Sequence, residues 1–183
     1  MIAVVVLLVI LVLLVVFVIA QYNSLVRLRN ETQNAWAQVD VVLRRRYDLV
    51  PNLVETVKGY AAHESETLEA VIQARSGAVD ASAVTEQADS ENMLSGALRR
   101  LFALSEAYPA LKADNNFLEL QTELTRTEKH IAYARANYNE SVLSFNNKVQ
   151  VAPSNIIAGM FNFVVGDFFE TEDESADPPS VAF

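Results

Sequence analysis

The sequence contains no cysteine among its 183 residues, only two histidines, and only five glycines and five prolines. The absence of cysteine excludes a disulfide framework, a thiolate nucleophile and any zinc or iron–sulfur site with cysteine ligands. Two histidines argue against a metal centre built on several imidazoles. Because glycine and proline interrupt regular structure and are scarce here, we expect long uninterrupted elements.

Positive charge is also scarce. The chain carries 14 Lys and Arg against 23 Asp and Glu, which gives a formal net charge of −9. A protein of this sign repels the phosphate backbone of DNA and RNA. Nonspecific nucleic-acid binding is therefore disfavoured, and we expect no nucleic acid as a partner.

Charge is absent altogether from residues 2–20, a run of 19 apolar residues that includes Ile2, Val9, Leu14 and Ala20. A helix of this length rises about 28 Å, close to the ~30 Å thickness of a bilayer's hydrocarbon core. A cleavable signal peptide would have a basic start, a shorter apolar run and a small-residue cleavage site. The sequence instead continues Gln-Tyr-Asn. It therefore predicts a retained transmembrane anchor over residues 1–21, in contact with membrane lipid, with a buried core helix as the alternative.

The basic residues near this run predict its orientation. Arg27 and Arg29 follow it closely, Arg44, Arg45 and Arg46 come next, and no Lys or Arg precedes it. Under the positive-inside rule, this asymmetry places the carboxy-terminal part in the cytoplasm and the amino terminus outside. We expect a single-pass protein of the cell membrane.

After the anchor, apolar residues recur at helical spacing through Leu25, Leu28, Trp36, Val39, Leu43 and Tyr47. The anchor and this segment are expected to form one long helix that ends at Pro51, since proline disfavours helical geometry at the residue before it and lacks a backbone donor. Residues 48–52 could form either a hairpin or a kink. We favour a hairpin, because each apolar stripe needs a partner helix.

Three further apolar stripes follow, over residues 53–72, 93–104 and 117–149, and residues 76–92 are interpreted as a connection with a weak helix start. Four amphipathic helices with short connections predict an all-α fold, an antiparallel four-helix bundle preceded by an N-terminal transmembrane helix. The predicted organisation is an anchor over 1–21, a bundle over 22–152, an apolar segment over 153–169 and an acidic, proline-containing tail over 170–183.

The last of these stripes contains a heptad. Apolar residues fall every seven positions from Phe117 to Phe145, while the interleaved seam holds Gln121, Glu128 and Arg135. A buried polar layer that fixes helix register is one interpretation, and a seam that turns partly to solvent is the other. The candidate buried polar network is Trp36, Asp40, Arg45, Gln121, Glu128 and Arg135.

The segment 153–169 is too apolar to lie in water as a free helix and too short and interrupted to span a membrane. It must pack on its own bundle, on another subunit or in the lipid interface. The candidate assembly or interfacial residues are Ile156, Ile157, Phe161, Phe163, Phe168 and Phe169. The following stretch, 170–177, carries five acids and no base and is expected to be solvated.

Recognisable catalytic motifs are missing. The sequence has no glycine-rich phosphate loop, no GxSxG and no HExxH. The residues three positions before His63 and His130 are Tyr60 and Thr127, so neither completes the Glu-x-x-His motif of di-metal bundles. We therefore predict no catalytic residue, no metal site and no cofactor, and a protein that is not an enzyme.

Several stretches together resemble the LemA family. The most specific are Ala35-Trp-Ala-Gln-Val-Asp-Val41 and Arg45-Arg-Tyr-Asp-Leu-Val-Pro-Asn-Leu-Val-Glu-Thr-Val-Lys-Gly-Tyr-Ala61, supported by 22–30, 108–113, 120–124 and 153–158. The resemblance covers nearly all of residues 22–183. It implies a membrane-anchored protein with a helical bundle, and it does not imply an enzyme.

Two functions remain open from the sequence. The first is a structural membrane scaffold that self-assembles as a homo-oligomer, which the long helix, the polar seam and the apolar segment favour. The second is a signalling or adaptor protein whose bundle docks a membrane partner, such as a protease, that the residues do not identify.

Overall fold

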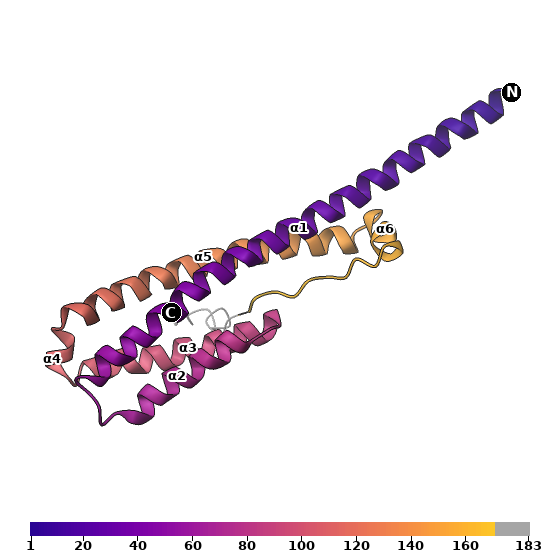
Figure 1. The fold of residues 1–183 in the computed structure, drawn as a ribbon. Coiled ribbons are helices and arrows are strands. Elements are labelled where there is room, and N and C mark those ends of the chain that lie inside the picture. The colour runs from indigo at the N-terminus through magenta and orange to yellow at the C-terminus, as the bar shows by residue number, and fades with distance from the viewer. Residues whose placement is uncertain (171–183) are drawn as a thin grey trace, which may run out of the picture. The chain divides into compact units, whose positions relative to one another are not determined.

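The structure is a computed structural model that describes residues 1–170. Every regular element in that range is a helix, which confirms the predicted all-α class. The helices are α1 (Ile2–Lys58), α2 (Ser65–Asp80), α3 (Val84–Ser105), α4 (Pro109–Lys112), α5 (Asn115–Gln150) and α6 (Ser154–Met160) (Figure 1). Of the predicted acidic tail, all but Glu170 lies outside the described residues.

The chain forms two compact units, which we describe one at a time. Unit 1 consists of Met1–Ala37 and Ala136–Asp167, and unit 2 of Gln38–Arg135 and Phe168–Phe183. The long helices α1 and α5 contribute to both units. As predicted, the apolar run continues into the following segment as one helix.

The core of unit 1 is apolar and draws on three helices. Leu25 of α1, Phe145 of α5 and Ile157 and Ala158 of α6 are buried together with Phe163, which follows α6. Aromatic rings extend this core: the Tyr22 ring lies 4.8 Å from that of Phe161 and 5.9 Å from that of Phe163, centroid to centroid. Part of the apolar segment 153–169 therefore packs on α1 and α5.

A C-terminal cap on α6 turns Phe163 back into this core. Asn162 has a φ of 55°, in the left-handed region, and the N–H of Phe163 donates to the carbonyl of Ala158 at 2.9 Å. This is the Schellman arrangement, in which the residue after the left-handed one also contacts the last helical turn. The cap explains why the apolar segment stops being helical after Met160.

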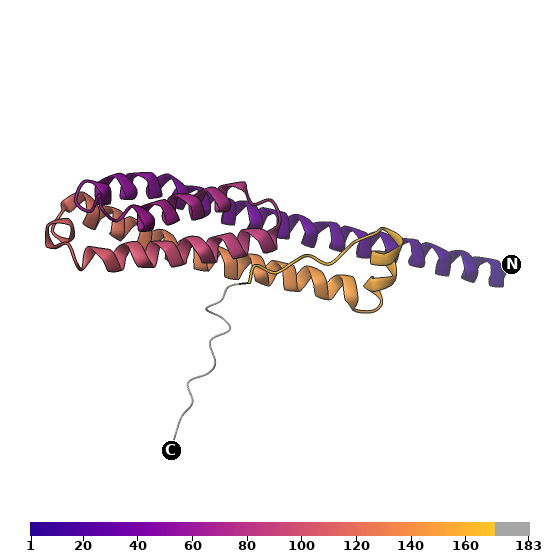
Figure 2. The same cartoon turned by 90° about the horizontal axis from the view of Figure 1, so that it is seen from below.

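Unit 2 is a four-helix arrangement of the later part of α1, α2, α3 and the first part of α5. Helices α2 and α3 lie side by side and antiparallel (Figure 2). The apolar seam of the heptad prediction for α5 holds, since Phe117, Leu124 and Ile131 in this unit and Tyr138 and Phe145 in unit 1 are all buried. The interleaved polar seam is not buried, since Gln121 is half-buried and Glu128 is exposed. Other fully buried residues of unit 2 are Val39, Leu53, Leu94, Leu101 and Leu111.

The prediction that the first helix ends at Pro51 is wrong, because α1 continues through Pro51 to Lys58. Proline removes the N–H that would bond to the carbonyl four residues earlier, that of Tyr47. Arg75 of α2 supplies the missing donor, with its Nε 2.8 Å from the Tyr47 carbonyl oxygen. Residues 48–52 are therefore helical, and the favoured hairpin is absent.

The turn instead lies between Lys58 and Ser65, so the second helix begins later than its apolar stripe predicted. The interpretation of 76–92 as a connection is also wrong for most of its length. Helix α2 continues to Asp80 and α3 already begins at Val84. The carboxylate of Glu86 stabilises that start by accepting a bond from the N–H of Ser82 at 3.1 Å.

Candidate functional site

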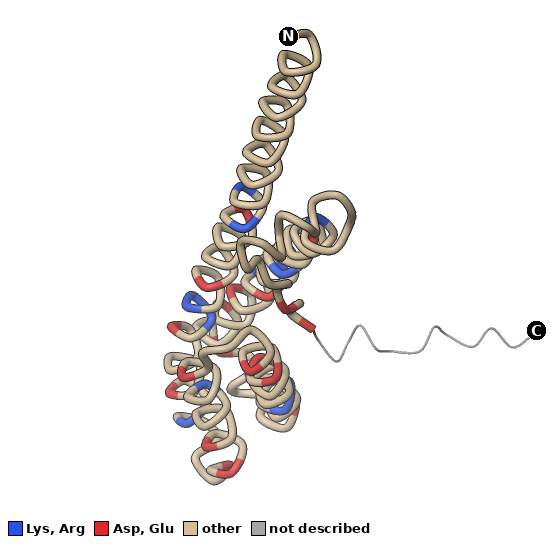
Figure 3. The backbone as a smooth tube through the Cα atoms, turned by 90° about the vertical axis from the view of Figure 1, so that its right-hand side faces the viewer, with Lys and Arg blue, Asp and Glu red and all other residues tan. Residues whose placement is uncertain are grey.

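The first candidate site is the apolar start of α1 in unit 1. No Lys, Arg, Asp or Glu lies on it, and the first charges on this helix appear at Arg27 and Arg29 (Figure 3). Its side chains are exposed: Ile2 is 83% exposed, Val9 53% and Leu14 57%, and Ala20 is exposed as well. Of the helices in residues 1–170, α1 is the one long and apolar enough to cross a membrane.

The second candidate site is a buried ion pair in unit 2. Arg46 of α1 is 3% exposed and Glu91 of α3 is 1% exposed, and Nη1 of Arg46 lies 2.8 Å from Oε2 of Glu91. Nη2 of Arg46 donates to Oγ of Ser95 at 2.7 Å. A second carboxylate, that of Glu128 on α5, lies 3.5 Å from Nη1 and is half exposed.

Tyr47 and Gln87 complete the network around Glu91. The Tyr47 hydroxyl donates to Oε1 of Glu91. Nε2 of Gln87 lies 2.9 Å from the Tyr47 hydroxyl and 3.0 Å from the carbonyl oxygen of Ala78 on α2. Polar groups from α1, α2 and α3 therefore meet in one buried cluster, and the half-exposed Glu128 of α5 lies at its edge.

Burial dominates the ionisation of this cluster. Loss of solvent raises the pKa of the Glu91 carboxyl above its ordinary value, although the Arg46 charge and the Tyr47 hydrogen bond oppose the shift. Burial and the bond to Glu91 raise the pKa of Tyr47, so that its hydroxyl stays protonated and donates. Such a pair is costly to desolvate.

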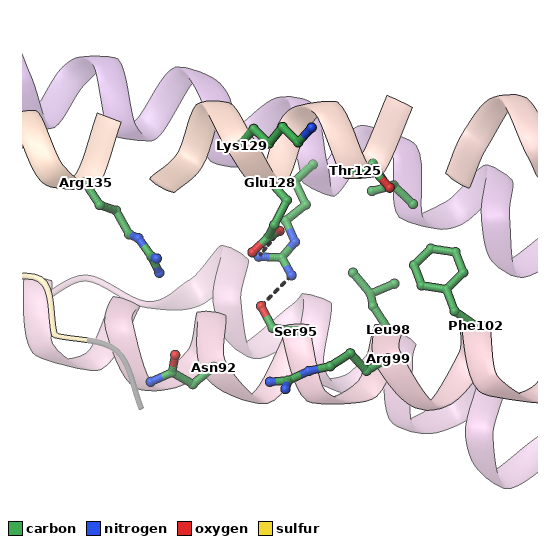
Figure 4. A pocket seen from close by; sticks show the side chains of 11 residues that line it. Asn92, Ser95, Leu98, Arg99, Phe102, Thr125, Glu128, Lys129 and Arg135 are labelled. Atoms are coloured by element: carbon green, nitrogen blue, oxygen red, sulfur yellow. Dashed lines mark hydrogen bonds and ion pairs between the residues drawn. The ribbon is translucent and has the colours of Figure 1, made fainter. Parts of the chain in front are cut away.

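Beside the ion pair lies a pocket of about 450 Å³ within unit 2. Figure 4 shows Asn92, Ser95, Leu98, Arg99 and Phe102 on α3 facing Thr125, Glu128, Lys129 and Arg135 on α5. Arg46 and Leu124 complete the lining. The pocket thus combines a cationic part with an apolar part.

The structure distributes the predicted polar network over several places. In unit 1, the Trp36 ring lies 5.1 Å from the Tyr138 ring. Asp40 pairs with Arg44 on the surface of α1 at 2.9 Å, and Gln121 is half-buried on α5. Glu128 and Arg135 both line the pocket.

The prediction that Arg45 belongs to a buried polar network is wrong, because the buried arginine is its neighbour Arg46. Arg45 has a side chain 56% exposed and pairs with Glu123 at 2.6 Å. Helical spacing contained this signal, because Arg46 lies three residues after buried Leu43 and four before buried Val50. Glu91 and Gln87 were missed because the acidic stretch was interpreted as a connection, although Gln87, Glu91 and Ser95 follow at intervals of four.

The predicted assembly or interfacial residues divide into two groups. Ile157, Phe163 and Phe169 are buried. Ile156 is 63% exposed, and Phe161 and Phe168 are also exposed. In unit 2, the guanidinium carbon of Arg135 lies 5.5 Å from the centroid of the Phe169 ring.

Neither histidine is part of a group that could hold a metal ion within residues 1–170. His63 and His130 are both exposed. In the same range no group of three His, Cys, Asp or Glu side chains is placed to hold a metal ion.

Comparison with known proteins identifies the family. The sequence profile of the LemA family matches residues 35–183, which is most of the chain and includes all of the buried network. The chain belongs to the LemA family. Protein LemA of Metamycoplasma hominis is 31% identical over 164 residues, covering 87% of this chain and 74% of that protein.

More distant relatives of this LemA-family chain are named magnetosome proteins. MamQ 2 of Paramagnetospirillum magneticum is 26% identical over 190 residues, and MamQ of Magnetospirillum gryphiswaldense is 24% identical over 190 residues. Each alignment covers 90% of this chain and 70% of the relative. None of these names denotes an enzymatic activity. Together with the apolar helix, the relatives support a membrane-associated helical protein.

Proposed function

We propose that this LemA-family protein is a non-enzymatic, membrane-anchored scaffold that self-associates through the apolar segment after α5. The observation that carries the proposal is the exposure of apolar side chains in unit 1. They include the run 2–20 except half-buried Val18 and, in the segment, Ile156, Met160, Phe161, Val164 and Val165. Surfaces of this kind mark membrane or protein contacts.

The run 2–20 fits a lipid environment. Its helix is about as long as a bilayer core is thick, and its backbone groups are satisfied within the helix. Tyr22, which follows the run, suits the interface between lipid and water. The positive-inside rule supports a cytoplasmic bundle with the amino terminus outside, because Arg27 and Arg29 follow the run closely.

A second copy of the chain is the occupant that best fits the exposed part of the apolar segment. Residues 153–169 contain no Lys or Arg, so attraction to anionic lipid headgroups cannot hold them at the surface. Val164 is 75% exposed and Met160 is 67% exposed, next to a core that is already filled. Anchoring confines copies to a plane, which raises their effective concentration for self-association.

Because the natural chain has no cysteine, single-cysteine variants give a clean test. Val164→Cys places a thiol in the exposed apolar segment, and Glu140→Cys is a matched control on the exposed surface of α5 in the same unit. Purified variants in vesicles are treated with a short bismaleimide cross-linker at several protein-to-lipid ratios. We expect a covalent dimer for Val164→Cys and a monomer for Glu140→Cys.

Two other results would contradict self-association. If Val164→Cys stays monomeric in vesicles and links to no protein in native membranes, the segment contacts lipid only. If it is monomeric in vesicles but links to a different protein in native membranes, the adaptor function replaces the scaffold. Labelling Glu140→Cys with a membrane-impermeant maleimide in intact and lysed cells tests the orientation, and we expect labelling only after lysis.

A further inference from the structure

The pocket of unit 2 concentrates positive charge in a protein whose net charge is −9. Four cations line it, Arg46, Arg99, Lys129 and Arg135, and the one acid in the lining is Glu128. Glu91 lies behind Arg46 and offsets one further charge. With Glu91 counted, the pocket still holds two positive charges in excess.

These cations retain unused binding capacity. Within residues 1–170, Arg99, Lys129 and Arg135 form no ion pair within 4.0 Å. Nε of Arg46 is buried and has no hydrogen-bond partner among the described residues, although the rest of that guanidinium is paired. A buried donor without a partner costs free energy.

The arrangement of the cations suits a single anion. Figure 4 shows the Arg135 side chain of α5 extending into the space between α5 and α3, while the Arg99 side chain lies along α3. Arginine presents a planar fork of donors that matches the oxygens of a phosphate group. A pocket with two such forks in its lining, on α3 and α5, therefore favours a phosphate over a neutral ligand.

The other part of the pocket is apolar. Leu98 and Leu124 are each 5% exposed, and Phe102 contributes an aromatic ring. In Figure 4, Leu98 and Phe102 lie at one end of the pocket and Arg135 at the opposite end. The volume of about 450 Å³ is sufficient for a small organic ligand.

We propose that this pocket binds a phosphate monoester that carries an apolar group. A phosphate monoester has a charge of about −1.5 to −2 at pH 7, which neutralises the excess of two positive charges. Its oxygens lie among Arg46, Arg99 and Arg135, and its apolar group lies against Leu98, Leu124 and Phe102. The ligand is either a free small molecule or a lipid whose headgroup ends in a phosphate monoester, since both present the same chemistry.

The test is isothermal titration calorimetry of the full chain in a nonionic detergent with phenyl phosphate as the probe. We expect phenyl phosphate to bind about tenfold more tightly than inorganic phosphate, which lacks the apolar group, or benzoate, which lacks the second charge. Absence of binding by phenyl phosphate would overturn the proposal. Equal binding of benzoate would overturn the assignment to a dianionic phosphate.

Neighbouring arginines provide matched controls for the site. Arg99→Gln removes an exposed cation from the pocket, while Arg100→Gln removes the adjacent exposed cation on the same helix outside it. We expect Arg99→Gln to weaken phenyl phosphate binding about tenfold and Arg100→Gln to change it less than about twofold. If both substitutions weaken binding equally, phenyl phosphate is attracted by the overall charge of the protein, and the assignment to this pocket is overturned.

A short-chain phosphatidic acid distinguishes the two sources of the ligand, with a phosphatidylcholine of the same chain length as its control. Binding of the phosphatidic acid that phenyl phosphate displaces supports a lipid ligand. Binding of phenyl phosphate alone supports a free small molecule. Both results support the phosphate monoester, and displaceable binding of the phosphatidylcholine would contradict it.

Discussion

Units 1 and 2 share the helices α1 and α5, yet these helices bury different side chains in the two units. In unit 1 they bury Leu25 and Phe145 against α6, and the buried polar side chain of Asn146 is uncharged and bonds to the backbone of Gly166. In unit 2 they place Arg46 against Glu91 and bring Glu128 beside them. Apolar packing is non-directional, whereas a buried ion pair is satisfied at one alignment of its helices.

This difference suits different tasks. A unit that carries a membrane segment and exposes apolar residues gains from packing that tolerates small shifts. A four-helix unit with repeating apolar stripes has several possible registers, and a buried charged cluster penalises all but one of them. Full-chain unfolding by urea in a nonionic detergent can separate the units, because the single tryptophan, Trp36, lies in unit 1 while circular dichroism follows all helices.

The largest expected loss of stability comes from removing one partner of the buried ion pair between Arg46 and Glu91. Glu91→Ala leaves the Arg46 charge buried without its main partner, and we expect a loss of about 4 kcal/mol in the free energy of unfolding. The circular dichroism transition should shift more than the Trp36 fluorescence transition. As a control, Arg45→Ala, which removes an exposed ion pair, should cost less than about 1 kcal/mol.

The double variant Arg46→Leu with Glu91→Leu sharpens the comparison, because it gives unit 2 an apolar core like that of unit 1. We expect its stability to lie within about 2 kcal/mol of the wild type, since replacing both charges removes the desolvation penalty. A double variant no more stable than Glu91→Ala would contradict this explanation of the single variant.

A smaller effect is expected in unit 1. Phe163→Ala removes a buried ring from the core and should cost about 3 kcal/mol. The Trp36 fluorescence transition should now shift at least as much as the circular dichroism transition, the reverse of Glu91→Ala. Identical shifts of both signals in both variants would show that the two units unfold as one.

A still smaller effect tests how α1 passes through Pro51. Arg75→Met removes the donor to the Tyr47 carbonyl and should cost about 1.5 kcal/mol. In a Pro51→Ala background, the N–H of residue 51 can bond to that carbonyl, so the same substitution should cost much less. Equal costs in the two backgrounds would mean that Arg75 acts through other contacts.

The most gradual effect is a pH dependence. The folded state raises the pKa of Glu91 above its ordinary value of 4.5, so Glu91 binds its proton more tightly in the folded than in the unfolded chain. Its contribution to stability is full below pH 4.5 and is lost as the pH rises through the folded pKa. Relative to Glu91→Gln, the wild type should therefore lose stability as pH increases from 4.5. If the wild type instead gains stability over this pH range, the attraction of the Arg46 charge outweighs the cost of burying the Glu91 carboxylate.

Local patterns predicted the helical class and much of the core. The heptad from Phe117 to Phe145 and the stripe through Leu25, Val39 and Leu43 identify faces that are indeed buried. Strong periodicity succeeds because a helix buries the same face over many turns. The sequence does not predict the pocket, although two of its lining residues, Glu128 and Arg135, are candidates for the buried polar network.

The failures arose where a distant residue changes a local rule. Proline normally ends a helix, but Arg75 supplies the donor that Pro51 lacks, and no local pattern contains that contact. An acidic stretch usually marks a solvated connection, but Arg46 brings Glu91 into the core. In α5, the second buried row runs through Thr127 and Ala134. The predicted seam through Glu128 and Arg135 is therefore displaced by one residue from the row that is buried.

The comparison between the units depends on unit 1 serving a membrane, and one measurement tests this directly. Native membranes are washed with alkaline carbonate, and the chain is then located and analysed by mass spectrometry for peptides from residues 2–20. We expect the chain in the membrane pellet with these residues present. A chain that is released into the soluble fraction and lacks its first twenty residues would contradict the account.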